Sequence, residues 1–105
     1  MLVNLTPHDV FVHYGAGDTR RIVSAPMPAR IEYTFERERG EIEGVQVRYI
    51  CDTTVVNLPE PVEGTTYIVS SLVKTYCWER EDVVCPGDMV KDDTGRIIGC
   101  RSFMR

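Results

Sequence analysis

The sequence contains no long apolar segment and no cluster of basic residues, and its first residues do not predict a leader. No run approaches the roughly 20 apolar residues that a transmembrane helix needs, and the first residues lack the basic and apolar regions of a signal peptide. The formal net charge is −4, and the basic residues are scattered. Duplex nucleic acid is therefore an unsuitable partner, because it requires a basic face. These absences predict a cytoplasmic protein without membrane contact.

The sequence also lacks the short motifs that mark common chemistries. It has no P-loop, no dinucleotide-binding glycine motif and no paired-carboxylate signature. The four cysteines, at positions 51, 77, 85 and 100, never have the CxxC spacing typical of zinc sites. We therefore predict no metal and no cofactor, and interpret the cysteines as reduced thiols that pack as small apolar groups.

The length and composition indicate one small globular domain. A chain of 105 residues fits a single domain over positions 1–105, and 43% hydrophobic residues suffice for a compact core. There is no solenoid repeat and no low-complexity tract.

Alternation of apolar and polar residues predicts two antiparallel pairs in the first half of the chain. The expected strands occupy residues 2–14 with a break at 6–8, then 20–24, 31–35, 45–49 and 53–56. The glycine-rich stretch at 15–18 predicts a turn in the first pair. The charged stretch at 36–40 predicts a solvated turn or tip in the second pair. Clean alternation is typical of a sheet with one buried face.

The second half of the chain predicts a buried strand followed by one short helix. Residues 65–69 are β-branched and aromatic, which is typical of a buried strand. Ser70-Ser71 can cap a helix over about 71–79. The expected buried face of that helix holds Leu72, Val73 and Tyr76.

The C-terminal stretch predicts a closing hairpin. Residues 86–88 are expected to form a turn, and residues 92–95 a four-residue hairpin loop. Ile97 and Ile98 point to opposite faces of the last strand, which suits a strand buried on both sides. The fold class that follows is mainly β (α+β), a small antiparallel sheet or partly closed barrel with one short helix.

The first candidate site lies in the loop before the second strand segment. His8 beside Asp9 could act as a general base or anchor a ligand. Alternatively, Thr6 and Asp9 close a local turn and His8 is merely exposed. We include Asn4, Thr6 and His8 among the candidate ligand contacts.

The second candidate site is the serine pair at the junction of strand and helix. A serine there resembles the placement of a hydrolase nucleophile, but the flanking glycines of Gly-x-Ser-x-Gly are missing. A helix cap is the simpler interpretation of Ser70 and Ser71. Free backbone N–H groups at a helix start also suit a phosphate or carboxylate, so both serines are candidate ligand contacts.

Arginines on the last strand form the third candidate. Guanidinium groups of Arg96 and Arg101 could bind a phosphate if they face a concave surface. The alternative is an ion pair between Arg96 and Asp92 or Asp93 across the hairpin.

Three stretches of the chain resemble a known group of proteins. These are Asn4-Leu5-Thr6-Pro7-His8 at the start, residues 58–73, and Asp92-Asp93-Thr94-Gly95-Arg96-Ile97-Ile98-Gly99-Cys100 at the end. Together they resemble a family of short uncharacterised proteins of tailed phages, prophages and bacteria, with an "NLTPH" start and a "DxxGRIIGC"-like end. The resemblance covers about half the chain and implies a small accessory protein in the cytoplasm of a bacterial host cell.

These observations lead to three hypotheses. The first is a homo-oligomer that binds a small anionic ligand, a nucleotide signal, without converting it and so antagonises host defence. The second is an interaction module that inhibits a host protein. The third is a small hydrolase-type enzyme with His8 as base and Ser70 or a cysteine as nucleophile. We favour binding over catalysis.

Overall fold

The chain is mainly β-structure with one short helix, as the sequence predicts. The computed structural model describes the backbone of residues 1–105 and the side chains of all residues except 37–39. The elements are β1 (Leu2–Asn4), β2 (Val10–Tyr14), β3 (Asp18–Ile22), β4 (Arg30–Ile42), β5 (Val45–Val56), β6 (Thr66–Ile68), α1 (Ser71–Thr75), β7 (Val83–Lys91) and β8 (Ile97–Met104).

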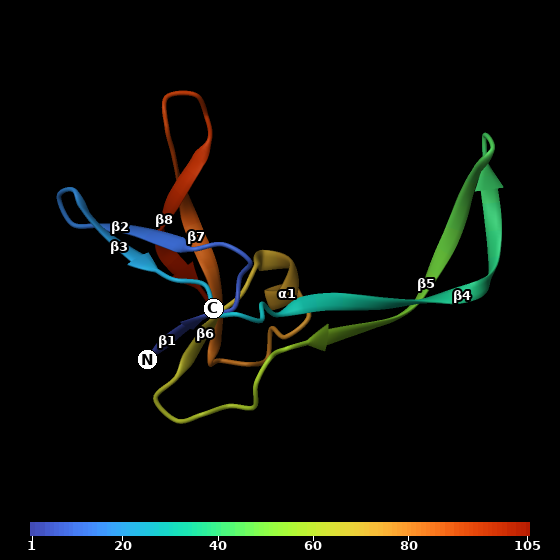
Figure 1. Ribbon diagram of the computed structural model, residues 1–105, viewed down its shortest axis with the longest axis horizontal. Helices are drawn as coiled ribbons and strands as arrows, with labels where there is room; N and C mark the ends of the chain where they lie inside the picture. The colour runs from blue at the N-terminus through green and yellow to red at the C-terminus, as the bar shows by residue number, and fades with distance from the viewer.

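Six strands form a curled sheet that resembles half of a barrel, and two form a separate antiparallel pair (Figure 1). The order of the large sheet is β1-β6-β7-β8-β2-β3. It is a mixed sheet, because β6 runs parallel to β1 and β7, and β8 runs parallel to β2. The expectation of a partly closed barrel is confirmed. Strands far apart in the sequence thus become neighbours, which brings the N-terminal hairpin beside the C-terminal one.

The hairpin of β2 and β3 forms where the alternation predicts it. Its register pairs Val10 with Ile22 and Tyr14 with Asp18. The connecting turn contains Gly15 and Gly17, both with positive φ, which a glycine adopts without steric strain. This hairpin is held to the rest of the sheet by β8, with Val12 opposite Cys100.

The curled sheet buries residues on both of its faces. Strand β6 is flanked by β1 and β7, and successive residues of the segment point to alternate sides. One cluster lies under α1 and consists of Leu5, Ala29, Tyr67, Val69, Val73, Cys77 and Val83. The other lies inside the curl and consists of Val10, Ile22, Ile68, Val84 and Cys100. Burial of the predicted strand at 65–69 is confirmed for Tyr67, Ile68 and Val69.

Helix α1 is shorter than the expected 71–79 and ends at Thr75. Hydrogen bonds of the tighter i→i−3 type follow, for example from Cys77 N–H to the Lys74 carbonyl. The buried Lys74 ammonium then donates to the carbonyls of Trp78 and Arg80, which satisfies backbone groups beyond the helix end. Aromatic and β-branched residues extend a helix poorly, so the chain turns here.

The buried face of α1 also differs from the expected one. Val73 is buried as predicted, but Lys74 and Cys77 accompany it. Leu72 and Tyr76 are 53% and 45% exposed, respectively. The helix crosses the sheet for only one and a half turns, so one narrow stripe of side chains reaches the core.

The expected turn at residues 86–88 is wrong, because Pro86 and Gly87 lie within β7. Strand β6 pairs with β7 only as far as Val84, so β7 is an edge strand beyond that residue. Proline is tolerated at such an edge, since its missing N–H is not needed on the open side. The hairpin loop after Lys91 is confirmed.

Strand β8 begins with exposed residues and not with the expected residues buried on both sides. Ile97 is 57% exposed and Ile98 is 42% exposed. Burial begins further along, at Cys100, where β2 lies alongside. The start of β8 is paired with β7 on one side, but β2 pairs with β8 only at Cys100, so these apolar residues meet solvent.

Strands β4 and β5 form a long hairpin that extends away from the large sheet (Figure 1). The expected turn at 36–40 is wrong, because β4 continues to Ile42; the side chains of residues 37–39 lie outside the described residues. The chain turns at Glu43 and Gly44, both with positive φ, as in a two-residue hairpin loop. The short strand expected at 53–56 is the end of β5, and register shifts near Phe35 interrupt the pairing.

Candidate functional site

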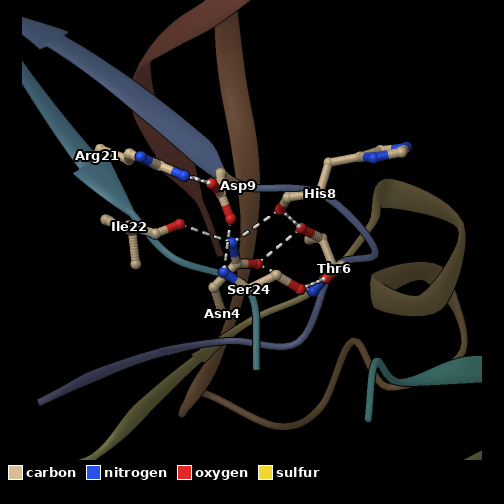
Figure 2. Close-up of polar contacts among 7 residues, drawn as sticks. All are labelled: Asn4, Thr6, His8, Asp9, Arg21, Ile22 and Ser24. Atoms are coloured by element: carbon tan, nitrogen blue, oxygen red, sulfur yellow. Dashed lines mark hydrogen bonds and ion pairs between the residues drawn. The ribbon is translucent and has the colours of Figure 1, made fainter. Parts of the chain in front are cut away.

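The buried Asn4 side chain organises the loop between β1 and β2 (Figure 2). Its Nδ2 donates to the carbonyls of His8 and Ile22, each at 2.9 Å. Its Oδ1 accepts from the Thr6 N–H at 2.9 Å and lies 2.6 Å from Thr6 Oγ1. Thr6 Oγ1 is also 2.7 Å from the His8 carbonyl, so its single hydrogen is shared between two acceptors. All four hydrogen-bonding positions of the Asn4 amide are therefore occupied.

A second set of contacts ties this loop to the chain after β3. Asp9 Oδ2 accepts from Arg21 Nε at 2.8 Å, and Asp9 Oδ1 accepts from the Ser24 N–H at 2.9 Å. The Ser24 hydroxyl donates to the Thr6 carbonyl at 2.5 Å. Figure 2 shows both sets of contacts side by side, with the His8 ring pointing away from them. The backbone of the loop is thereby held, while the imidazole stays exposed.

Acid is expected to weaken the Asp9 contacts. The Ser24 N–H first, and the Arg21 side chain second, hold the pKa of Asp9 below its ordinary value of 3.8. A lowered pKa means that the carboxylate stabilises the folded chain above the unfolded pKa, and that this contribution is lost as pH falls through the folded pKa. The free energy of unfolding should thus decline less steeply from about pH 5 toward about pH 2 in Asp9→Asn than in wild type. Parallel curves from urea titrations would contradict this role.

Three distant segments of the chain meet around one open hollow of about 810 Å³. The first loop contributes Thr6 and His8, and the start of α1 contributes Ser70 and Ser71. The last hairpin contributes Arg96. Five of the seven candidate residues thus line the same hollow, although the sequence separates them by up to 90 positions.

The hollow has an apolar lining that was not among the candidate residues. Phe11, Met89, Ile97 and Ile98 all contribute to it, and their side chains are 39–57% exposed. Ile97 and Ile98 carry a usable signal, since they are adjacent apolar residues directly after a hairpin loop. The alternation pattern assigns them to a core, because sequence alone does not reveal that β2 pairs with β8 only from Cys100.

The Arg96 guanidinium at this hollow has no partner among the side chains that the structure describes. The alternative ion pair with Asp92 does not form, because that carboxylate accepts hydrogen bonds from other groups of the hairpin loop. Asp92 Oδ1 accepts from Thr94 Oγ1 at 2.6 Å, from the Thr94 N–H at 2.9 Å and from the Arg96 N–H at 3.0 Å. The bond from the Thr94 side chain is the main cause that lowers the pKa of Asp92. The hairpin loop therefore holds the Arg96 backbone and leaves its charge free.

In the described residues that line the hollow, no nucleophile is hydrogen-bonded to a base. Ser70 is the N-cap of α1, and its Oγ accepts from the Val73 N–H at 3.3 Å. Within the described part of the chain, the His8 ring forms no hydrogen bond with Ser70 or with any cysteine. Asp9 binds Arg21 and Ser24 and does not orient His8.

Two of the candidate residues lie outside the lining of the hollow. Asn4 is 1% exposed and acts on the loop from beneath, so it positions Thr6 and His8. Arg101 follows the buried Cys100 on β8 and, by strand alternation, projects to the opposite face. Arg96 therefore lines the hollow and Arg101 does not, a difference that the sequence alone does not indicate.

Comparison with known proteins yields no matching family model, no matching curated protein and no matching solved structure. Among the described residues, no helix has the length and apolar character needed to cross a membrane. Within that same part of the chain, no group of three His, Cys, Asp or Glu residues could hold a metal ion.

Proposed function

We propose that the hollow binds a small anionic ligand, a nucleotide signal, and holds it without converting it. The observation that carries the proposal is the meeting of three segments around an apolar lining with one unpaired guanidinium. A guanidinium donates two parallel hydrogen bonds to a phosphate. Exposed Phe11 and Ile98 offer the apolar surface against which the face of a base can pack.

Arg96 supplies the main attraction for the anion in this proposal. Helix α1 has only five residues and its N-cap hydroxyl is already bound, so its dipole contributes little. Thr6, Asp9, Ser70 and Asp92 also line the hollow, but their side chains are hydrogen-bonded within the protein. The exposed Ser71 hydroxyl and the exposed His8 ring are further polar groups of the lining. They suit hydrogen bonds to a ribose or to phosphate oxygens.

The biological role that we propose is sequestration. The resemblance to short phage and prophage proteins supports a setting in the cytoplasm of a bacterial host cell, where retention of a nucleotide signal would antagonise host defence. The absence of a bonded Ser70–His8 pair in the described residues supports retention over turnover. A second candidate, a module that inhibits a host protein, is supported by the exposure of Ile97 and Ile98.

Isothermal titration against mononucleotides, cyclic dinucleotides and ADP-ribose-type compounds tests the proposal. We expect at least one of them to bind, and chromatography after denaturation to return it unchanged. A chemically altered ligand would favour the enzyme hypothesis. Retention of no member of the panel by the pure, folded protein would overturn the proposal, and a stable host-protein complex would then favour the interaction module.

Arg96→Ala is expected to weaken binding of that nucleotide by about 10- to 100-fold, since a charged hydrogen-bond donor to phosphate contributes about 1.5–3 kcal/mol. Arg101→Ala is the matched control, because it removes the same kind of side chain from a nearby position on β8 that does not line the hollow. The control should bind as wild type does. Equal losses in both variants would indicate a general effect of charge and contradict a site at the hollow.

A further inference from the structure

The hairpin of β4 and β5, residues 30–56, is a two-stranded arm without a third strand beside it (Figure 1). Only its inner end meets the body, where Ile31 and Val55 pack against the core under α1. An isolated two-stranded ribbon is marginally stable in water. The outer part of this arm therefore lacks the packing that a hairpin of its length needs.

Apolar side chains are exposed along the whole arm. The larger ones are Tyr33 (38% exposed), Phe35 (40%), Tyr49 (52%), Ile50 (57%), Ile42 (66%) and Val45 (67%). The pairing register places Phe35 opposite Ile50 in the inner half and Ile42 opposite Val45 at the tip. Directly paired residues share a face, so each half presents an apolar pair to solvent.

The surface area of the chain exceeds that of a compact monomer of the same mass. The accessible area is 7697 Å², whereas a folded monomer of 12.0 kDa exposes about 6,000 Å². The radius of gyration is 17.1 Å, against about 13 Å for a compact domain of this length. The excess of about 1,700 Å² is roughly twice what one partner buries in a standard interface. A large obligate interface would account for it.

Charges indicate which surface the arm fits. Its tip carries Glu41 and Glu43 beside the apolar pair, with no basic residue between positions 40 and 47. The body of the same chain carries exposed guanidinium groups that such a tip can contact. Arg20, Arg101 and Arg105 are exposed, and none forms an ion pair among the residues the structure describes. Exposed arginines on the body of a second copy can therefore pair with the acidic tip.

We propose that the arm is a self-association device, and that its tip docks on the body of a second copy of this chain. Reciprocal docking of two arms forms a closed dimer with twofold symmetry, in which each outer arm gains the packing that it lacks alone. The inference goes beyond the proposed ligand binding and does not depend on it.

Sedimentation velocity and light scattering of the full chain at micromolar concentration test the proposal. Wild type should have at least twice the 12.0 kDa mass of one chain. The double variant Ile42→Glu, Val45→Glu should have the mass of one chain, because four acidic residues would then crowd the tip. A wild-type chain that sediments as a monomer would overturn the proposal and would leave a different protein as the occupant of the arm.

The matched control places the same change on the body. Val23→Glu with Val62→Glu replaces valines that are 65% and 55% exposed and lie outside the arm. This control should keep the wild-type mass. Far-UV circular dichroism should show both variants folded, since none of the four side chains belongs to a core cluster. Loss of association in the control, or its persistence in the tip variant, would each contradict the proposal.

Discussion

Replacing Asn4 with alanine is expected to lower the free energy of unfolding by about 3–5 kcal/mol. The substitution removes four hydrogen-bonding positions from a side chain that is 1% exposed. The Ile22 carbonyl and the Thr6 N–H then lose their Asn4 contacts in the interior. An unsatisfied buried group costs about 1–3 kcal/mol, and two such groups together with the cavity account for the expected loss.

Urea unfolding followed by far-UV circular dichroism, at one fixed protein concentration, measures this loss. Asn4→Asp separates shape from hydrogen bonding, because it keeps the acceptors for Thr6 but sets a carboxylate against the carbonyls of His8 and Ile22. It should be at least as destabilising as the alanine. Thr75→Ala, at an exposed helical threonine, is the control and should stay within about 0.5 kcal/mol of wild type. A stable Asn4→Ala variant would refute the role of this amide.

Local patterns predict the elements of this fold wherever neighbouring residues decide the structure. The hairpin of β2 and β3 follows from alternation and a glycine turn, and the buried strand β6 follows from β-branched and aromatic residues. The single short helix begins at its serine cap, as expected. In each case the signal lies within about ten residues, and no distant segment has to supply it.

Long-range pairing decides the features that local patterns miss. The sequence predicts a turn at Pro86, but this residue lies in β7. The proline fits there because β6 ends its pairing with β7 at Val84, which leaves that side of β7 open. The charged stretch at 36–40 is read as a turn, but the chain turns at Glu43 and Gly44, where both residues have positive φ. Which strands lie side by side, and how far each one extends, is a property of the whole sheet.

In the candidate site, too, local residue types predict some features and long-range pairing decides the others. Polar residue types single out Thr6, His8, Ser70, Ser71 and Arg96, and the curled sheet brings these five to one hollow. Sequence does not separate Arg96 from Arg101, because it does not show that the hollow is lined by the hairpin loop and the start of β8 and not by the strand beyond Cys100. Nor does it identify Asn4 as a residue that acts from beneath, since that role requires β3 to lie beside the loop.

The junction between β2 and β8 depends on a glycine, and its substitution is expected to have the second large effect. A Cβ at Gly99 would lie 2.5 Å from the Phe11 carbonyl oxygen and 2.5 Å from two atoms of the His13 ring. The backbone oxygen cannot move unless β2 moves with it. We expect Gly99→Ala to lower the free energy of unfolding by about 3 kcal/mol, as overpacking against a rigid neighbour does.

Gly87→Ala is the matched control for Gly99→Ala, because it adds the same methyl group to the neighbouring strand. Its Cβ would lie 2.5 Å from Met104 Cγ, but that methionine is flexible and 57% exposed. The control should therefore stay within about 1 kcal/mol of wild type. Equal effects of the two alanines would show that methyl volume alone matters, and not the backbone oxygen behind Gly99.

A double-mutant cycle separates the two neighbours of Gly99. His13→Ala removes the ring that the new Cβ would meet but leaves the Phe11 carbonyl in place. Combined with Gly99→Ala, it should restore only part of the lost stability, with a coupling of about 1 kcal/mol. Full restoration would assign the whole clash to the ring. Partial restoration would mean that the clash with the Phe11 carbonyl oxygen still displaces β2. Gly99 and Phe11 both line the hollow, so the hollow would then change shape.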